Sequence, residues 1–132
     1  MKWYHRRRLE KLANFLKTLK RKQFDFTEII AKSENGCGTV CCAVGWLPAV
    51  DRNIKWAQDL LIDDLLNKKT GEEITFRFGY ASDGILNYFG ISQDEAKALF
   101  IPNQQYLIGE NELGEKATPK QVAKLIEKFL KK

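Results

Sequence analysis

The chain has 132 residues, of which 44% are hydrophobic and 30% are charged, and its formal net charge is +5. This length and composition predict one soluble globular domain over residues 1–132. No apolar run approaches the roughly 20 residues that cross a bilayer, and no signal-peptide core follows the basic start. We therefore expect a cytoplasmic protein that does not contact a membrane.

Positive charge is concentrated at the two ends of the chain. Residues 1–22 carry nine Lys or Arg against one Glu, and residues 116–132 carry six Lys against one Glu. Residues 23–115 carry seven basic against fifteen acidic residues. The protein is thus basic at its ends and acidic in its middle.

The first predicted elements are helices. Over Arg6–Lys20, apolar residues recur at helical spacing and basic residues occupy the other side, which predicts an amphipathic helix. A short helix beginning at Thr27 is expected to end near Asn35-Gly36. The nearly uncharged segment Cys37–Leu47 predicts a buried helix of about two turns, and we expect Pro48 to stop it.

The middle of the chain carries one further helix and one strand by its pattern. Ile54–Asn67 is predicted to be a helix with an apolar and an acidic side, ended by Thr70-Gly71. Ile74–Phe78 alternates with period two and is the only good strand signal, so a partner strand is needed. We consider Tyr106–Ile108 as that partner.

Two helices are predicted to meet at a tight corner. Ala81–Phe89 is helical by its pattern, and Gly90 stands where a left-handed residue ends a helix. Ser92 and Glu95 have the spacing of a capping box, which begins a second helix that must end before Pro102.

The last predicted helix begins at residues 118–121, where Thr118 precedes a proline at the first helical position and a glutamine at the third. The predicted fold class is therefore mainly α, a compact bundle of about five or six short helices with at most one small β-hairpin. We place the Cys37–Leu47 helix at its centre. The residues expected in the core are Leu9, Leu12, Leu16, Val44, Trp46, Leu86, Phe89, Leu99, Phe100, Leu125, Ile126 and Phe129.

The central small-residue segment, together with the helix corner and the closing helix, resembles a family. Small bacterial and phage-encoded proteins share a Cys-Gly-Thr-x-x-Cys-x-x-Gly-Trp element, a Phe-Gly-Leu/Ile-Ser corner and a closing Ala-Thr-Pro helix. Two adjacent cysteines, Cys41 and Cys42, stand where that pattern has one. The resemblance covers most of the chain and implies a fold and a phage or mobile-element setting, but no reaction. The residues that we assign to this structural motif are Cys37, Gly38, Thr39, Cys41, Gly45 and Trp46.

The cysteines have three interpretations. A structural zinc site needs four ligands. Cys37-x3-Cys41 forms one possible half of such a site, but no second pair follows and His5 is the only histidine, so a zinc site is disfavoured. A redox pair is disfavoured because the spacing is not Cys-x-x-Cys and no thioredoxin-like pattern surrounds it. We favour packed, reduced thiols beside Gly45, with Trp46 as a core anchor, and we expect neither a metal nor another cofactor.

Other signatures of catalysis are absent from the sequence. No nucleophile elbow, zinc-protease string or phosphate-binding loop occurs, and His5 lies in a basic stretch that we expect to be exposed. Asp59, Asp63 and Asp64 on the predicted helix could hold a hard cation, but a solvated acidic face is the preferred interpretation.

The basic N-terminal region is the candidate interaction surface. Its cations could contact phosphates or acidic proteins, and its aromatic residues, like Tyr80, are of the type enriched at interfaces. Solvation is the expected role of Lys120, Lys124 and Lys128. The candidate surface comprises Trp3, Tyr4, Arg6, Arg7, Arg8, Lys11, Arg21 and Lys22.

Three functional hypotheses follow from these features. The leading one is a non-catalytic interaction protein, carried by a phage or mobile element, that binds a bacterial host protein such as a defence component; inhibition of that protein is one version of this hypothesis. The second is a nucleic-acid-binding protein that uses the basic N-terminal helix. The third is an enzyme that depends on the thiolate of Cys37 or Cys41.

Overall fold

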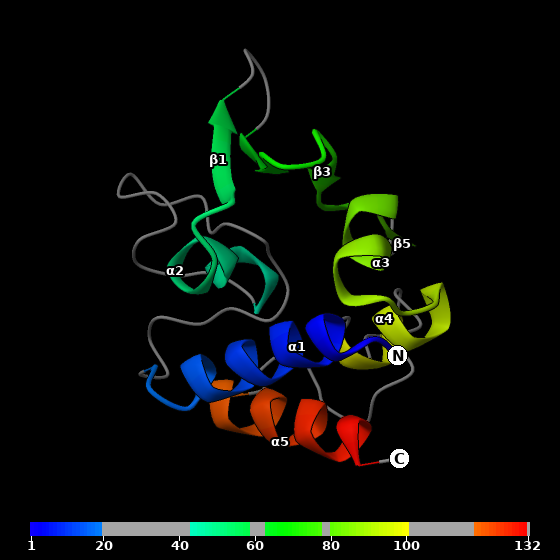
Figure 1. Cartoon of the computed structure of the whole chain (residues 1–132). Helices are drawn as coiled ribbons and strands as arrows, with labels where there is room; N and C mark the ends of the chain where they lie inside the picture. The colour runs from blue at the N-terminus through cyan, green and yellow to red at the C-terminus, as the bar shows by residue number, and fades with distance from the viewer. Residues whose placement is uncertain (20–42, 59–62, 78–79, 101–117, 132) are drawn as a thin grey trace.

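The computed structural model describes residues 1–19, 43–58, 63–77, 80–100 and 118–131. Within them the chain is mainly α-helical and adds two small antiparallel sheets (Figure 1). The helices are α1 (Trp3–Leu16), α2 (Leu47–Val50), α3 (Asp83–Phe89), α4 (Gln93–Phe100) and α5 (Pro119–Leu130), with a 3-10 turn η3 (Val44–Trp46). The strands are β1 (Ile54–Gln58), β2 (Asp63–Asn67), β3 (Glu73–Ile74), β4 (Phe76–Arg77) and β5 (Tyr80–Ala81).

Helices α1 and α5 lie side by side although they come from opposite ends of the chain (Figure 1). Each helix carries buried residues at spacings of three and four, which places them on one face. The guanidinium Nη1 of Arg6 donates a 2.7 Å hydrogen bond to the carbonyl oxygen of Leu130. Lys17 and Glu127 form an ion pair of 2.8 Å between the same two helices. Helices α2 and α3 pack against α1, and α4 packs against α5.

The first helix is confirmed with shifted bounds. It begins three residues before the predicted Arg6 and ends at Leu16 instead of Lys20. At its end, the backbone N–H and the hydroxyl of Thr18 both donate to the carbonyl of Phe15. These three-residue bonds tighten the last turn and end the regular helix.

The prediction that Pro48 stops a helix is wrong. The 3-10 turn η3 ends at Trp46, and Pro48 is the second residue of a new short helix, α2. Proline fits there because the first turn of a helix does not need its backbone N–H groups. Residues 37–42 of the predicted helix, and the predicted helix after Thr27, lie outside the described residues.

The predicted helix over Ile54–Asn67 is also wrong, because its two ends are antiparallel strands. β1 pairs with β2 in a register that sets Ile54 opposite Asn67 and Gln58 opposite Asp63. Leu65 of β2 pairs in turn with Ile74 of β3, and both side chains are fully buried. The apolar residues of this stretch fit a period of two as well as a helical period, and burial against β3 favours the strands.

The predicted strand at Ile74–Phe78 is divided between two sheets. Ile74 belongs to β3 and pairs with β2, whereas Phe76 belongs to β4 and pairs with Ala81 of β5. Between them, the backbone N–H of Thr75 bonds to the hydroxyl of Ser82. The proposed partner at residues 106–108 lies outside the described part of the chain.

The corner between α3 and α4 is as predicted. Ser82 caps α3, and Gly90 ends it in the left-handed region with φ of 63°. The capping box of α4 is complete, since the Ser92 N–H donates to the Glu95 carboxylate and the Glu95 N–H donates to the Ser92 hydroxyl. The capping box of α5, between Thr118 and Gln121, is complete as well.

The core joins all these elements. Of the predicted core residues, Leu86, Leu125 and Phe129 are only partly buried and pack against the core. No helix in the described segments has the length and apolar character that a bilayer crossing needs. The predicted core residues that are buried are Leu9, Leu12, Leu16, Val44, Trp46, Phe89, Leu99, Phe100 and Ile126.

Candidate functional site

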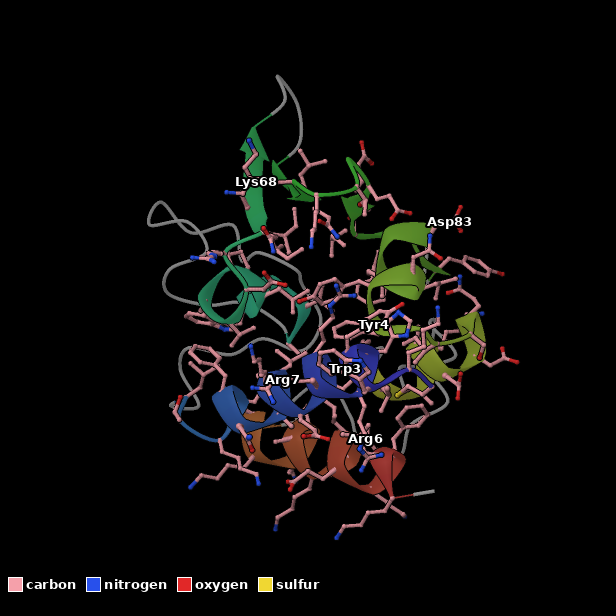
Figure 2. All side chains as sticks on the ribbon, in the orientation of Figure 1. Trp3, Tyr4, Arg6, Arg7, Lys68 and Asp83 are labelled. Carbon is pink, nitrogen blue, oxygen red and sulfur yellow. The ribbon has the colours of Figure 1, made fainter. Side chains whose placement is uncertain are left out.

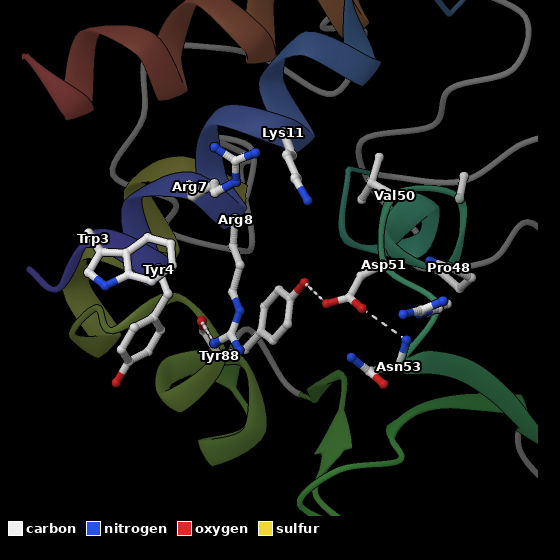
Figure 3. A pocket seen from close by; sticks show the side chains of 12 residues that line it. Trp3, Tyr4, Arg7, Arg8, Lys11, Pro48, Val50, Asp51, Asn53 and Tyr88 are labelled. Atoms are coloured by element: carbon white, nitrogen blue, oxygen red, sulfur yellow. Dashed lines mark hydrogen bonds between the residues drawn. The ribbon is translucent and has the colours of Figure 1, made fainter.

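An open hollow of about 640 Å³ lies where α1, α2 and α3 meet (Figure 3). Its size is within the range of ligand pockets in proteins. One wall is the N-terminal part of α1, another is α2 with the turn that follows it, and Tyr88 of α3 closes the third side. The lining residues are Trp3, Tyr4, Arg7, Arg8, Lys11, Pro48, Ala49, Val50, Asp51, Arg52, Asn53 and Tyr88.

Arg8 is held in place by α3. Its Nη1 donates a 2.8 Å hydrogen bond to the carbonyl oxygen of Tyr88. Its guanidinium lies 4.4 Å from the centre of the Tyr88 ring and 5.3 Å from the centre of the Tyr4 ring. Both tyrosine rings therefore already have a cationic partner, and Arg8 is a fixed positive charge in the hollow.

Asp51 is the one carboxylate of the lining. It follows α2 and accepts a 2.6 Å hydrogen bond from the Tyr88 hydroxyl and a 2.9 Å bond from the backbone N–H of Asn53. Burial raises the pKa of Asp51, but these two bonds and the charges of Arg8 and Lys11 outweigh burial and leave the pKa below its usual value. Burial and the bond to Asp51 raise the pKa of Tyr88 far above its usual value. Asp51 is therefore ionised and Tyr88 is neutral at physiological pH.

Three other cationic side chains at the hollow form no ion pair with a carboxylate of the described residues. Arg7, Lys11 and Arg52 are exposed, and in the part of the chain that the structure describes no carboxylate lies within ion-pairing distance of them. With Arg8, the lining has four cationic side chains against the single carboxylate of Asp51. The lining of the hollow therefore carries a net positive charge.

An apolar surface lies beside these charges. Trp3 is 75% exposed, and its indole meets the Tyr4 ring edge-on at a centroid distance of 6.0 Å. Pro48, Ala49 and Val50 of α2 line the facing wall. Tryptophan and arginine are among the residue types enriched at binding hot spots.

The structure brings together most of the predicted interaction surface. Trp3, Tyr4, Arg7, Arg8 and Lys11 all line the hollow. Among the described residues of that surface, Arg6 alone does not line the hollow. Arg21 and Lys22 lie outside the described residues.

Arg6 does not belong to the hollow. It lies over α5 (Figure 2), where it bonds to the Leu130 carbonyl and forms a 3.0 Å ion pair with Glu10. Its side chain joins the two helices, so its role is structural.

The expectation that His5 is exposed is wrong. Its ring is half-buried and lies directly over Gly90, with the Tyr4 ring 4.3 Å away between centroids. Burial, with the charges of Arg8 and Lys2, lowers the pKa of His5 below its usual value, although a hydrogen bond with the Asn87 backbone acts the other way. His5 therefore helps to join α1 to the corner after α3.

Of the residues assigned to the cysteine element, only Gly45 and Trp46 at its end are among the described residues. Gly45 and Trp46 are buried, as expected for a core anchor, whereas Cys37, Gly38, Thr39, Cys41 and Cys42 lie outside the described residues. Phe15 of α1 packs against Trp46 at a ring distance of 5.7 Å. Asp63 and Asp64 lie in strand β2 and not on a helix, and Asp59 is outside the described residues. The described residues contain no cluster of three or more His, Cys, Asp or Glu that could hold a metal ion.

Sequence reasoning missed the second half of the hollow. The turn Asp51–Asn53 and Tyr88 were not assigned to any site, because they become neighbours of α1 only in the folded chain. A signal was present in Arg52, a cation next to a nearly uncharged segment, and in the Asp-x-Asn spacing, which is typical of a turn closed by an Asp side chain.

The two hydrogen-bonded titratable groups of the hollow have shifted pKa values. Asp51 is a weak base because its pKa is lowered, and Tyr88 is a weak acid because its pKa is raised, so neither is tuned for proton transfer near neutral pH. The unpaired cations and the exposed indole are groups that attract an anionic partner. No known family, curated protein or solved structure matches this chain.

Proposed function

We propose that this protein is a non-catalytic interaction protein that binds a partner protein through the hollow between α1, α2 and α3. The observation that carries the proposal is the exposed indole of Trp3 beside the unpaired cations Arg7, Lys11 and Arg52. A protein that only had to fold would gain little by exposing this combination on one face.

The resemblance to small bacterial and phage-encoded proteins supplies the setting of the proposal. In that setting the partner is a bacterial host protein, for example a component of a defence system, and binding inhibits it in the cytoplasm. A small domain with a rigid basic surface is suited to covering a site on a larger protein.

The test is affinity capture from bacterial lysate with matched variants of the full chain. The wild-type protein is expected to retain one partner in stoichiometric amount, and Trp3→Ala and Arg7→Glu are expected to lose it. Lys124→Glu is the control, because Lys124 is an exposed lysine of α5 outside the hollow. Loss of the partner in the control variant, or its retention in both hollow variants, would refute the proposal.

A further inference from the structure

The hollow has features that distinguish between kinds of anionic partner. It combines fixed positive charge with an apolar wall, and its aromatic residues differ in how accessible they are. The inference below rests on the proposed function, because it names the chemistry of the partner at the same site.

The aromatic residues do not form a platform for successive bases. Proteins that bind single-stranded nucleic acid stack several bases on open aromatic faces. Here the guanidinium of Arg8 covers the rings of both Tyr4 and Tyr88, at 5.3 Å and 4.4 Å, and Tyr88 is buried. Among the aromatic residues that line the hollow, Trp3 alone is exposed.

The cations of α1 do not form a continuous track for a phosphate backbone. Arg6 is bonded to Leu130 and Glu10, and Lys17 is paired with Glu127, so both are directed to α5. The other cations of α1, which are Arg7, Arg8 and Lys11, line the hollow instead. This arrangement suits a short stretch of negative charge.

The wall formed by α2 offers apolar contact. Pro48 and Val50 are partly buried and Ala49 is exposed, and all three line the hollow opposite the N-terminal part of α1. Asp51 disfavours further negative charge on this side, whereas Arg7, Lys11 and Arg52 favour it around the rim. An apolar side chain is therefore best accommodated against α2, with carboxylates around it, and Trp3 offers a second apolar contact at the other end of the hollow (Figure 3).

We propose that the hollow binds an acidic segment of the partner protein that carries an apolar anchor residue. The anchor packs against the wall of Pro48 and Val50, carboxylates next to it pair with Arg7, Lys11 and Arg52, and the segment extends along α1 to the indole of Trp3. Charge complementarity speeds the encounter and the anchor slows dissociation.

The experiment uses the full chain and three synthetic probes, followed by NMR at low salt. The probes are a short Glu/Asp peptide with one central Leu-Phe pair, the same peptide with Gln/Asn in place of Glu/Asp, and a single-stranded DNA oligonucleotide. The acidic peptide is expected to shift the indole N–H signal of Trp3 and the amide signals of Arg7 and Arg52. The amide peptide should bind roughly tenfold more weakly, which corresponds to about 1.4 kcal/mol.

Variants separate this inference from the proposed function. Arg7→Glu is expected to weaken binding of the acidic peptide and Lys124→Glu to leave it unchanged. Equal binding of the acidic and amide peptides would overturn the inference, and so would tighter binding of the oligonucleotide at the same residues. If either result occurs while the captured partner is still lost in Trp3→Ala, the proposed function stands and only its chemistry is refuted.

Discussion

The hydroxyl of Tyr88 donates a 2.6 Å hydrogen bond to the carboxylate of Asp51, and this bond joins α3 to the residue that ends α2. The two residues are 37 positions apart in the chain. Because Arg8 of α1 also bonds to the backbone of Tyr88, one tyrosine connects the three helices that form the hollow. The shape of the hollow therefore depends on Tyr88.

Replacing Tyr88 by Phe is expected to destabilise the protein. The ring contact with Arg8 remains, but the bond to the ionised Asp51 is lost, which costs about 1.5 kcal/mol. Urea unfolding followed by circular dichroism measures the change. Tyr80→Phe is the control, because Tyr80 is 57% exposed and its substitution should leave the free energy of unfolding unchanged. Equal effects of the two substitutions would show that the bond to Asp51 contributes nothing.

Gly90→Ala is expected to destabilise the protein more than Gly71→Ala. Both glycines have positive φ, 63° and 77°, so an alanine at either position costs about 1 kcal/mol of backbone strain. A Cβ at Gly71 meets nothing within 4 Å, whereas a Cβ at Gly90 overlaps the ring of His5. The overlap should add about 1–3 kcal/mol, which comparative urea unfolding would detect.

The double variant His5→Ala/Gly90→Ala tests whether overlap with the His5 ring causes the loss of stability in Gly90→Ala. Removing the ring should restore part of the stability that Gly90→Ala loses, so the two substitutions should be non-additive. Strict additivity would mean that His5 does not limit the space at Gly90.

The stability of the protein is expected to depend on the protonation of His5. Burial and nearby positive charges hold its pKa in the folded state below the usual 6.5, so the unfolded chain binds the proton more tightly. The free energy of unfolding should therefore decrease as the pH falls from 6.5 through the lower pKa of the folded state. Between about pH 5 and pH 8, His5→Gln should reduce this decrease. A pH profile identical to that of the wild type would contradict the assignment.

Thr118→Ala is expected to weaken the attachment of α5. The Thr118 hydroxyl accepts from the Gln121 N–H at 3.2 Å, and the Gln121 side chain accepts from the Thr118 N–H at 2.8 Å. Loss of the cap costs about 1 kcal/mol, and Thr118→Ser should retain most of the stability because serine caps as well. Hydrogen exchange at the first turn of α5 provides a local measurement. Unchanged protection in the alanine variant would show that the cap is not needed there.

Local signals predicted the terminal helices and the corner well. The caps at Ser92 and Thr118 and the left-handed Gly90 depend on neighbours within three or four residues, so the sequence contains all the information needed. The same is true of the buried face of α1, whose apolar spacing was sufficient to identify Leu9, Leu12 and Leu16 as core.

The hairpin of β1 and β2 was not predictable in this way. Its apolar residues also fit a helix, and Leu65 of β2 is buried by pairing with Ile74 of β3, a contact that local sequence rules do not specify. The same holds for the hollow. Its α1 half was expected from the charged and aromatic residues of the sequence, whereas the half at Asp51–Asn53 could not be predicted because it depends on tertiary packing.

The bond between Arg6 and Leu130 spans 124 positions of the chain and has a consequence for synthesis on the ribosome. Because translation adds about 5–20 residues per second, several seconds pass between the synthesis of α1 and the synthesis of α5. During that time the apolar face of α1 lacks the helix that covers it in the folded protein. The nascent chain is therefore open to chaperones at this face until α5 arrives, because the contact between α1 and α5 forms only after α5 has been synthesised.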